Sequence, residues 1–151
     1  MADTIFQGGM KALVEGDLQT GADVRLALVT ASFTGASEED AVNLADFTTL
    51  GEFGGVGYQR IDCAGVTVTY DSSADEYRLD FDDDEFNASG STVAAGPAAA
   101  AGILVILHVD GTEANDIAIG HTDSGGFPVN ASNIAMTLTV PSGGLMYLGA
   151  A

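Results

Sequence analysis

The longest run of large aliphatic residues in the chain lies between positions 103 and 107, where Ile, Leu, Val, Ile and Leu follow one another. No helical or alternating polar period interrupts the stretch Ile103–Val109, which Gly102 and Asp110-Gly111 bound. Such a run is typical of a strand that is covered on both faces, whereas a buried helix would need a longer segment. The pattern therefore predicts a central strand with shorter strands around it.

A membrane span is the competing interpretation of this region, because no charged residue occurs between Phe86 and Val109. However, Gly96, Pro97 and Gly102 interrupt the region, both flanks are acidic, and no Lys or Arg follows to anchor it. We therefore expect no membrane span.

Alternation of apolar and polar residues predicts further strands before and after the central one. Two of them, Val66–Tyr70 and Tyr77–Phe81, are joined by about six residues and predict a β-hairpin. Asp116–His121 is expected to pair antiparallel with the central strand. The remaining expected strands are Val24–Thr30, a re-entry at Tyr58–Ile61, a neutral segment near Ser91–Ala95, Ile134–Val140 and Leu145–Leu148.

Two short helices are predicted. Apolar spacing in Thr4–Leu18 indicates an amphipathic helix, weakened by Gly8-Gly9 and ending near Gly16. Ser37 precedes three acidic residues and predicts an N-cap for a brief helix that ends at Leu44.

The frequent turn residues between these short strands indicate an all-β fold class, an antiparallel β-sandwich or jelly-roll-like arrangement. At 151 residues, with no linker, the chain is expected to form one domain spanning residues 1–151. Residues 1–20 would be its N-terminal helical segment, available for docking.

Charge narrows the possible partners. The chain has 22 acidic residues against four basic ones, a formal net charge of -18. This charge repels nucleic-acid backbones and anionic lipids, so neither is an expected partner. Only Asp110, Glu113, Asp116 and Asp123 are charged after Phe86. Such a charge-poor half is typical of a surface that meets other protein.

The acidic run at positions 80–85 is the most conspicuous candidate site. Its carboxylates are weak candidates for Ca²⁺ binding, since the run lacks the glycine and the ligand spacing of an EF-hand loop. The alternative is a solvated acidic turn with Leu79 and Phe81 facing the core. We expect no resident metal here; the candidate ligands are Asp80, Asp82, Asp83, Asp84 and Glu85.

Other chemistry-bearing residues are few. His108 and His121 would approach each other if their strands pair, but two histidines without a third ligand make a weak zinc site. His108 itself is expected to be a partly buried sheet residue. Cys63 is alone and has no base nearby in sequence, and Gly51–Gly57 lacks the Lys-Ser/Thr ending of a phosphate loop. We therefore expect no catalytic residue and no cofactor, and a structural or binding protein rather than an enzyme.

A series of short motifs follows one another along most of the chain, and none of them is catalytic. They are Leu13–Leu18, Leu28-Val29-Thr30, Gly57-Tyr58, Val68-Thr69-Tyr70-Asp71, Leu79-Asp80, Ile103–His108 and Ile119-Gly120-His121-Thr122-Asp123. In this order the motifs resemble those of small virion proteins of tailed bacteriophages. The poly-Ala run Ala98–Ala101 and the unusually acidic hairpin depart from the pattern.

The resemblance implies a capsid decoration, or cement, protein that binds the major capsid protein and copies of itself, with a trimer favoured. The start MADTIFQGGM lacks a secretion signal, so synthesis is expected in the host cytoplasm. The net charge favours the outer capsid surface, away from packaged DNA, with Asp71–Glu85 facing water. A tail, baseplate or fibre component is the alternative. A carbohydrate-binding β-sandwich is a further one, although the chain has no Trp.

Overall fold

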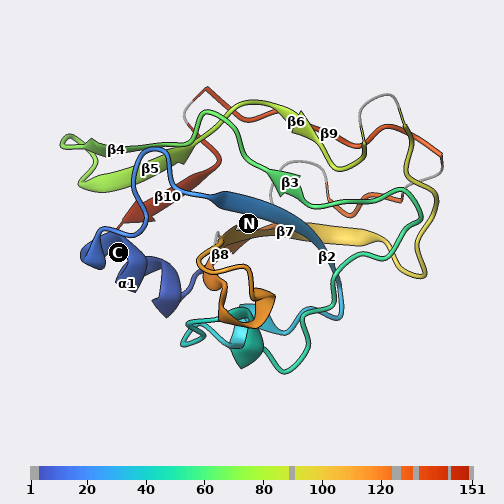
Figure 1. Ribbon diagram of the computed structural model, residues 1–151, viewed down its shortest axis with the longest axis horizontal. Coiled ribbons are helices and arrows are strands. Elements are labelled where there is room, and N and C mark those ends of the chain that lie inside the picture. The colour runs from blue at the N-terminus through green and yellow to red at the C-terminus, as the bar shows by residue number, and fades with distance from the viewer. Residues whose placement is uncertain (1–3, 89–90, 124–126, 131–132, 143, 150–151) are drawn as a thin grey trace.

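The computed structural model describes residues 4–88, 91–123, 127–130, 133–142 and 144–149, and within them the strands pair antiparallel. Figure 1 shows three groups of strands and one α-helix, α1 (Gln7–Glu15). The largest sheet has the order β1 (Thr4–Ile5), β8 (Ile117–Thr122), β7 (Ala100–Leu107), β2 (Val24–Thr30), β3 (Ile61–Asp62). A second sheet has the order β10 (Met146–Gly149), β5 (Glu76–Asp80), β4 (Thr67–Asp71). The third pairs β6 (Asp84–Glu85) with β9 (Thr137–Leu138). The predicted all-β, antiparallel class is confirmed.

The predicted central strand is β7, which lies in the middle of the five-stranded sheet. It begins at Ala100 and ends at Leu107, whereas the predicted strand was Ile103–Val109. Both ends were therefore predicted two to three residues too far along the chain. Alternate side chains enter two separate apolar clusters. Ile103, Val105 and Leu107 belong to the first, and Leu104 and Ile106 belong to the second. The prediction of a strand covered on both faces is therefore confirmed.

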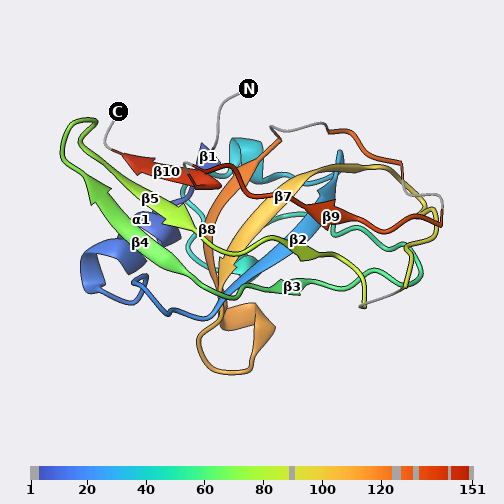
Figure 2. The ribbon, with the colours of Figure 1, turned by 90° about the horizontal axis from the view of Figure 1, so that it is seen from above.

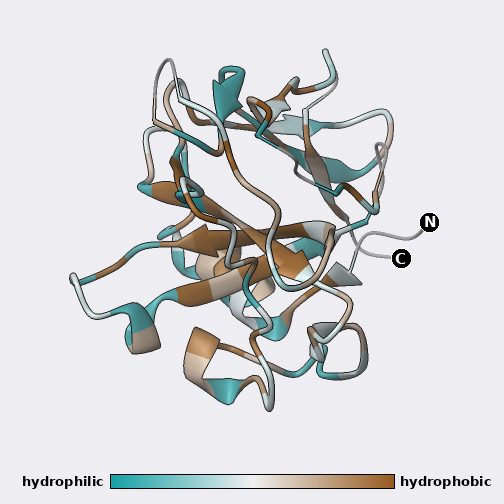
Figure 3. Ribbon diagram, turned by 90° about the vertical axis from the view of Figure 1, so that its right-hand side faces the viewer, coloured by the Kyte–Doolittle hydropathy of each residue, from teal (hydrophilic) through white to brown (hydrophobic). Residues whose placement is uncertain are grey.

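The first cluster lies between the five-stranded and three-stranded sheets, and we call it the main core. Leu26 and Leu28 of β2 contribute to it from one side, and Leu79 of β5 and Met146 of β10 from the other. These side chains are almost completely buried. Figure 3 shows hydrophobic residues along the strands that meet in the interior and hydrophilic residues in outer strands and turns.

The second cluster covers the opposite face of the five-stranded sheet. Phe6 and Phe47 lie at its centre, with ring centroids 5.0 Å apart. Phe33 packs against Phe47 at the same distance, 5.0 Å. The loop segment that contains Phe33 and Phe47 therefore covers β7 and β8, and we call this segment, residues 33–47, the lid.

This lid does not contain the helix predicted from Ser37 to Leu44. It has instead two single-turn 3-10 helices, η1 (Gly35–Ser37) and η2 (Leu44–Asp46). The Glu38 carboxylate accepts hydrogen bonds from the hydroxyl groups of Thr34 and Thr48, and the Asp46 carboxylate accepts the Asn43 backbone N–H. Such side-chain hydrogen bonds offer the backbone an alternative to helical bonds. Glu38 thus ties the loop together instead of stabilising a first helical turn, whereas Asp46 belongs to the capping box of η2.

The N-terminal helix is present but shorter than predicted, because Thr4 and Ile5 form β1 beside β8. It ends at Gly16, which has the left-handed φ of 85°. Gly8 and Gly9 face β8 so closely that an added Cβ would lie 2.7 Å from the Ala118 carbonyl oxygen and 2.4 Å from that of Ile119, respectively. The glycine pair therefore allows the helix backbone to rest directly on the strand.

The predicted hairpin is formed by β4 and β5, with Tyr70 opposite Tyr77.

Two other predicted strands are largely missing. Ser91–Ala95 contributes only an isolated bridge between Val93 and Ile134, and Ile134–Val140 contributes only the two residues of β9. Polar side chains bind the backbone on either side of β9: Asn87 Oδ1 accepts the Met136 N–H and Asp83 Oδ1 accepts the Val140 N–H. These bonds replace the ladder that a longer strand would need.

Candidate functional site

The acidic run does not form a cluster of converging carboxylates. Asp83 and Asp84 accept backbone N–H groups, from Val140 at 2.7 Å and from Glu85 at 2.7 Å. No group of three or more His, Cys, Asp or Glu side chains suited to a metal ion occurs among the described residues. Leu79 and Phe81 are buried, as the solvated-turn interpretation predicted. Asp80 accepts the Phe81 N–H and Glu85 accepts the Asn87 side-chain amide, while Asp82 is exposed.

The two histidines lie far apart, although β7 and β8 pair as predicted. His121 is opposite Leu104, whereas His108 follows the end of β7. Four residues of extended chain separate Leu104 from His108, or about 13 Å. The hypothesis that strand pairing brings the histidines together is therefore wrong. His121 instead packs against the Phe33 ring, with centroids 5.1 Å apart.

His108 is partly buried, as predicted, but it is not part of the sheet, because β7 ends at Leu107. Its Nδ1 lies 2.8 Å from Oδ1 of Asp116, whose side chain is fully buried. Asp116 also binds the loop through its backbone, since its carbonyl oxygen accepts the Leu44 N–H. The pair therefore fixes the turn between β7 and β8 against the lid.

Cys63 follows β3 and is partly buried. Burial raises the pKa of its thiol to about 12, and the negative charges of Asp84, Asp62 and Asp23 add to the shift. A cysteine nucleophile must ionise near neutral pH. The surroundings of Cys63 favour the neutral thiol and so oppose such a role.

A polar network lies at the outer edge of β2. The Leu28 N–H donates to the Tyr58 hydroxyl oxygen at 3.0 Å, and this hydroxyl donates to Oε1 of Glu52 at 2.9 Å. Arg60 binds both oxygens of Glu52, at 2.8 Å and 2.7 Å, and reaches Glu113 at 3.3 Å. Tyr58 therefore supplies the acceptor for the Leu28 N–H, next to the backbone bridge between Val29 and Glu52.

Electrostatics keep this network in one protonation state. Burial and the adjacent Glu52 carboxylate raise the pKa of Tyr58, so its hydroxyl stays neutral. The same carboxylate raises the pKa of Arg60, so its guanidinium stays charged. Both acceptors of Arg60 are supplied by the protein itself. The network thus anchors the Gly51–Gly57 loop rather than offering a cation to a phosphate.

We expect the Tyr58→Phe substitution to lower the free energy of unfolding by about 1–3 kcal/mol, because a largely buried backbone N–H loses its acceptor. Tyr147→Phe is the matched control, since the Tyr147 side chain is exposed. That change should stay within about 0.5 kcal/mol of the parent. Urea denaturation followed by circular dichroism measures both. Equal stability of the two variants would show that the hydroxyl of Tyr58 has no such role.

Exposed apolar side chains gather at one end of the molecule. Among the described residues, five of the eight exposed large hydrophobic side chains lie on α1 and the three-stranded sheet. Val14 is 83% exposed and Tyr70 is 52% exposed. Figures 1 and 2 both place α1 and the hairpin β4–β5 at the same end of the molecule. We call Met10, Val14, Tyr70 and Tyr77 the α1–hairpin surface.

The two tyrosines of this surface result from strand alternation. Tyr77 points to the same side of β5 as the fully buried Leu79, two residues away. The hairpin extends past the main core, so the core-facing side of its tip is exposed. There Tyr70 and Tyr77 form a ring pair with centroids 5.1 Å apart. An exposed aromatic pair of this kind is typical of surfaces that bind other protein.

None of the helices formed by the described residues has the length and apolarity that a membrane span requires. Comparison of the chain with protein-family models, with curated proteins and with solved structures finds no match.

Proposed function

We propose that the chain is a structural protein of a tailed-phage virion that binds the outer surface of the capsid, as a decoration or cement protein. The observation that carries the proposal is the α1–hairpin surface, where four large hydrophobic side chains are exposed on a chain with a net charge of -18. Large exposed apolar regions are typical of protein-binding surfaces. The proposal assigns no catalytic activity to the chain.

The positions of the motifs that resemble phage virion proteins support this proposal. Leu28–Thr30, Ile103–Leu107 and Ile119–Thr122 lie in β2, β7 and β8, which are neighbours in the five-stranded sheet. The other motifs include much of the hairpin, in β4 and β5. The resemblance thus involves paired strands of the scaffold rather than scattered loops.

The ion pairs support an outer location. Arg25, Arg60 and Arg78 are three of the four basic residues, and each pairs with acidic residues of this chain. Little positive charge is left to neutralise the phosphates of packaged DNA. A position inside the shell would therefore be repulsive.

The partners in this proposal are the major capsid protein and further copies of the chain, with a trimer favoured by the resemblance alone. The position of Tyr70 and Tyr77 changes one expectation from the sequence. In this proposal only one side of the hairpin faces water, because the side that carries Tyr70 and Tyr77 belongs to the docking surface. Its opposite side carries Arg78 against the Tyr147 ring at 5.5 Å, and Asp71.

Copy number on purified particles tests the proposal. Quantitative mass spectrometry against the major capsid protein should give a lattice-scale number of copies. A far smaller number would instead favour the alternative of a tail, baseplate or fibre component, and absence from particles would overturn any virion role. Specific binding of glycans by the purified protein through Tyr70 and Tyr77 would favour the carbohydrate-binding alternative.

Variants then test the docking surface. Val14→Asp should reduce the number of copies per particle about tenfold, because a charge would be buried in an apolar contact. Val109→Asp is the control, since Val109 is also exposed but lies beyond β7, outside the α1–hairpin surface. Equal occupancy of the two variants would exclude this surface as the docking site.

A further inference from the structure

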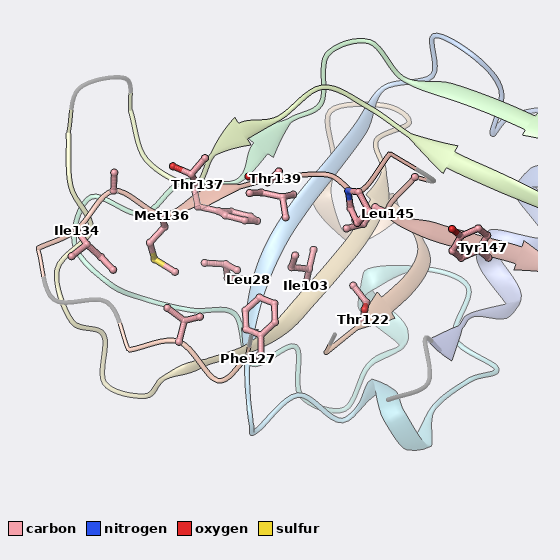
Figure 4. Close-up of a pocket in the computed structure, with 16 residues that line it drawn as sticks. Leu28, Ile103, Thr122, Phe127, Ile134, Met136, Thr137, Thr139, Leu145 and Tyr147 are labelled. Carbon is pink, nitrogen blue, oxygen red and sulfur yellow. The ribbon is translucent and has the colours of Figure 1, made fainter. Parts of the chain in front are cut away.

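A cavity of about 630 Å³ opens beside the main core, between the five-stranded sheet and a segment that includes residues 134–141, 144 and 145. Figure 4 shows its lining side chains. Leu28 of β2 and Ile103 of β7 form the floor, and Phe127 lies on one side. Met136 and Leu145 belong to the segment on the other side. The cavity thus reaches the central strands of the fold.

The cavity exists because the segment above the sheet is held away from it. The Asn87 side chain binds the Met136 N–H at 2.8 Å, and Asp83 binds the Val140 N–H at 2.7 Å. These bonds fix both ends of β9 to the β6 region, rather than to β2 or β7. Space remains between this segment and the floor of the cavity.

The chemistry of the lining is unusual for this chain. None of the 16 lining residues is charged, although 22 of the 151 residues are acidic. Its polar groups are three threonines and the hydroxyl of Tyr147 at the mouth. A charged ligand would find no counter-ion here, and an anion would also meet the negative field of the whole protein. An uncharged ligand meets neither penalty.

The size and depth of the cavity favour a small molecule over a protein surface. Small-molecule sites are mostly apolar clefts of about 300–1,000 Å³ with few polar groups. The floor residues Leu28 and Ile103 are only 1% and 2% exposed, so a flat partner surface could not reach them. A slender ligand would instead cover the partly exposed apolar walls, such as Phe127 and Val129, and removal of apolar surface from water is favourable.

We propose that this cavity binds an uncharged, apolar small molecule, aliphatic or aromatic, that carries at most one or two hydrogen-bonding groups. The ligand lies against Leu28, Ile103 and Phe127, with any polar group directed to Thr139 or Tyr147 at the mouth. Met136 adapts the wall to the ligand, since its side chain is flexible and polarisable. The site does not depend on the proposed virion role.

Titration of the purified full chain with Nile red, an uncharged apolar dye, tests the proposal. We expect saturable fluorescence enhancement with one dye bound per chain. The anionic dye anilinonaphthalene sulfonate should bind about tenfold more weakly, because the lining offers no counter-ion. Absence of saturable Nile red binding, or tighter binding of the anion, would overturn the proposal.

Variants locate the bound dye. Leu145→Trp fills part of the cavity, and Val109→Trp adds the same side chain outside it. We expect the first to weaken Nile red binding about tenfold and the second to leave it unchanged. Ile134→Asp, at an exposed position of the lining, provides a second test in case Leu145→Trp does not fold, as monitored by circular dichroism. Unchanged binding in a folded cavity variant would place the dye elsewhere and refute the site.

Discussion

Replacing Leu104 by alanine is expected to lower the free energy of unfolding by about 2–5 kcal/mol. Leu104 is completely buried in the second cluster, against Phe6 and Phe47. The sheet supports this cluster from one side only, so truncation leaves a cavity that the rigid β7 cannot close. Chemical denaturation measures the change.

Val109→Ala is the control for this prediction, because Val109 follows β7 and is 46% exposed. Its stability should remain within about 0.5 kcal/mol of the parent. If Leu104→Ala were equally mild, the second cluster would not be a packed core. Ile106→Ala should behave like Leu104→Ala, since Ile106 points to the same side of β7.

Replacing Gly9 by alanine is expected to destabilise the protein, although alanine is the better helix former. The added Cβ would lie 2.4 Å from the Ile119 carbonyl oxygen, which belongs to a backbone in the middle of the sheet. Overpacking typically costs about 1–3 kcal/mol, occasionally more, against a propensity gain of about 1 kcal/mol. We expect a net loss of about 2 kcal/mol, since neither backbone can yield without breaking hydrogen bonds.

Gly54→Ala provides the comparison. A Cβ at Gly54 would have its nearest neighbour at 3.9 Å, which is ordinary contact. Thermal melts should therefore show a lower Tm for Gly9→Ala and an almost unchanged Tm for Gly54→Ala. A stabilised Gly9→Ala variant would mean that α1 does not rest on β8.

The fold could be predicted from the sequence where local pattern and tertiary contacts agree. The predicted bounds of Val24–Thr30 coincide with those of β2, because its apolar residues contact both cores. The hairpin was found because alternation and its turn lie close together in sequence. The helix after Ser37 was wrongly predicted because Glu38 binds the loop residues Thr34 and Thr48 instead of a helical backbone.

The functional features were harder to predict, since they depend on residues far apart in sequence. The network of Glu52, Arg60 and Glu113 has no recognisable spacing, although Arg60 stands out as one of only four basic residues. The cavity arises from two side-chain bonds that hold β9 in place, which no periodicity encodes. Tyr70 and Tyr77 are exposed because the hairpin extends past the end of the main core. The sequence does not reveal this end, because apolar and polar residues alternate in the same way on both sides of it.

The pairing of β2 with β7 has a consequence for how the protein acquires its structure. Val24 is opposite Leu107, so the central ladder joins an early part of the chain to a late one. Closing such a large loop costs entropy before any contact offsets it, and folds with many distant contacts form slowly. During synthesis β2 must wait, with its apolar residues uncovered, until β7 has left the ribosome. The acidic residues concentrated in the chain between them would keep this unfinished intermediate soluble through mutual repulsion.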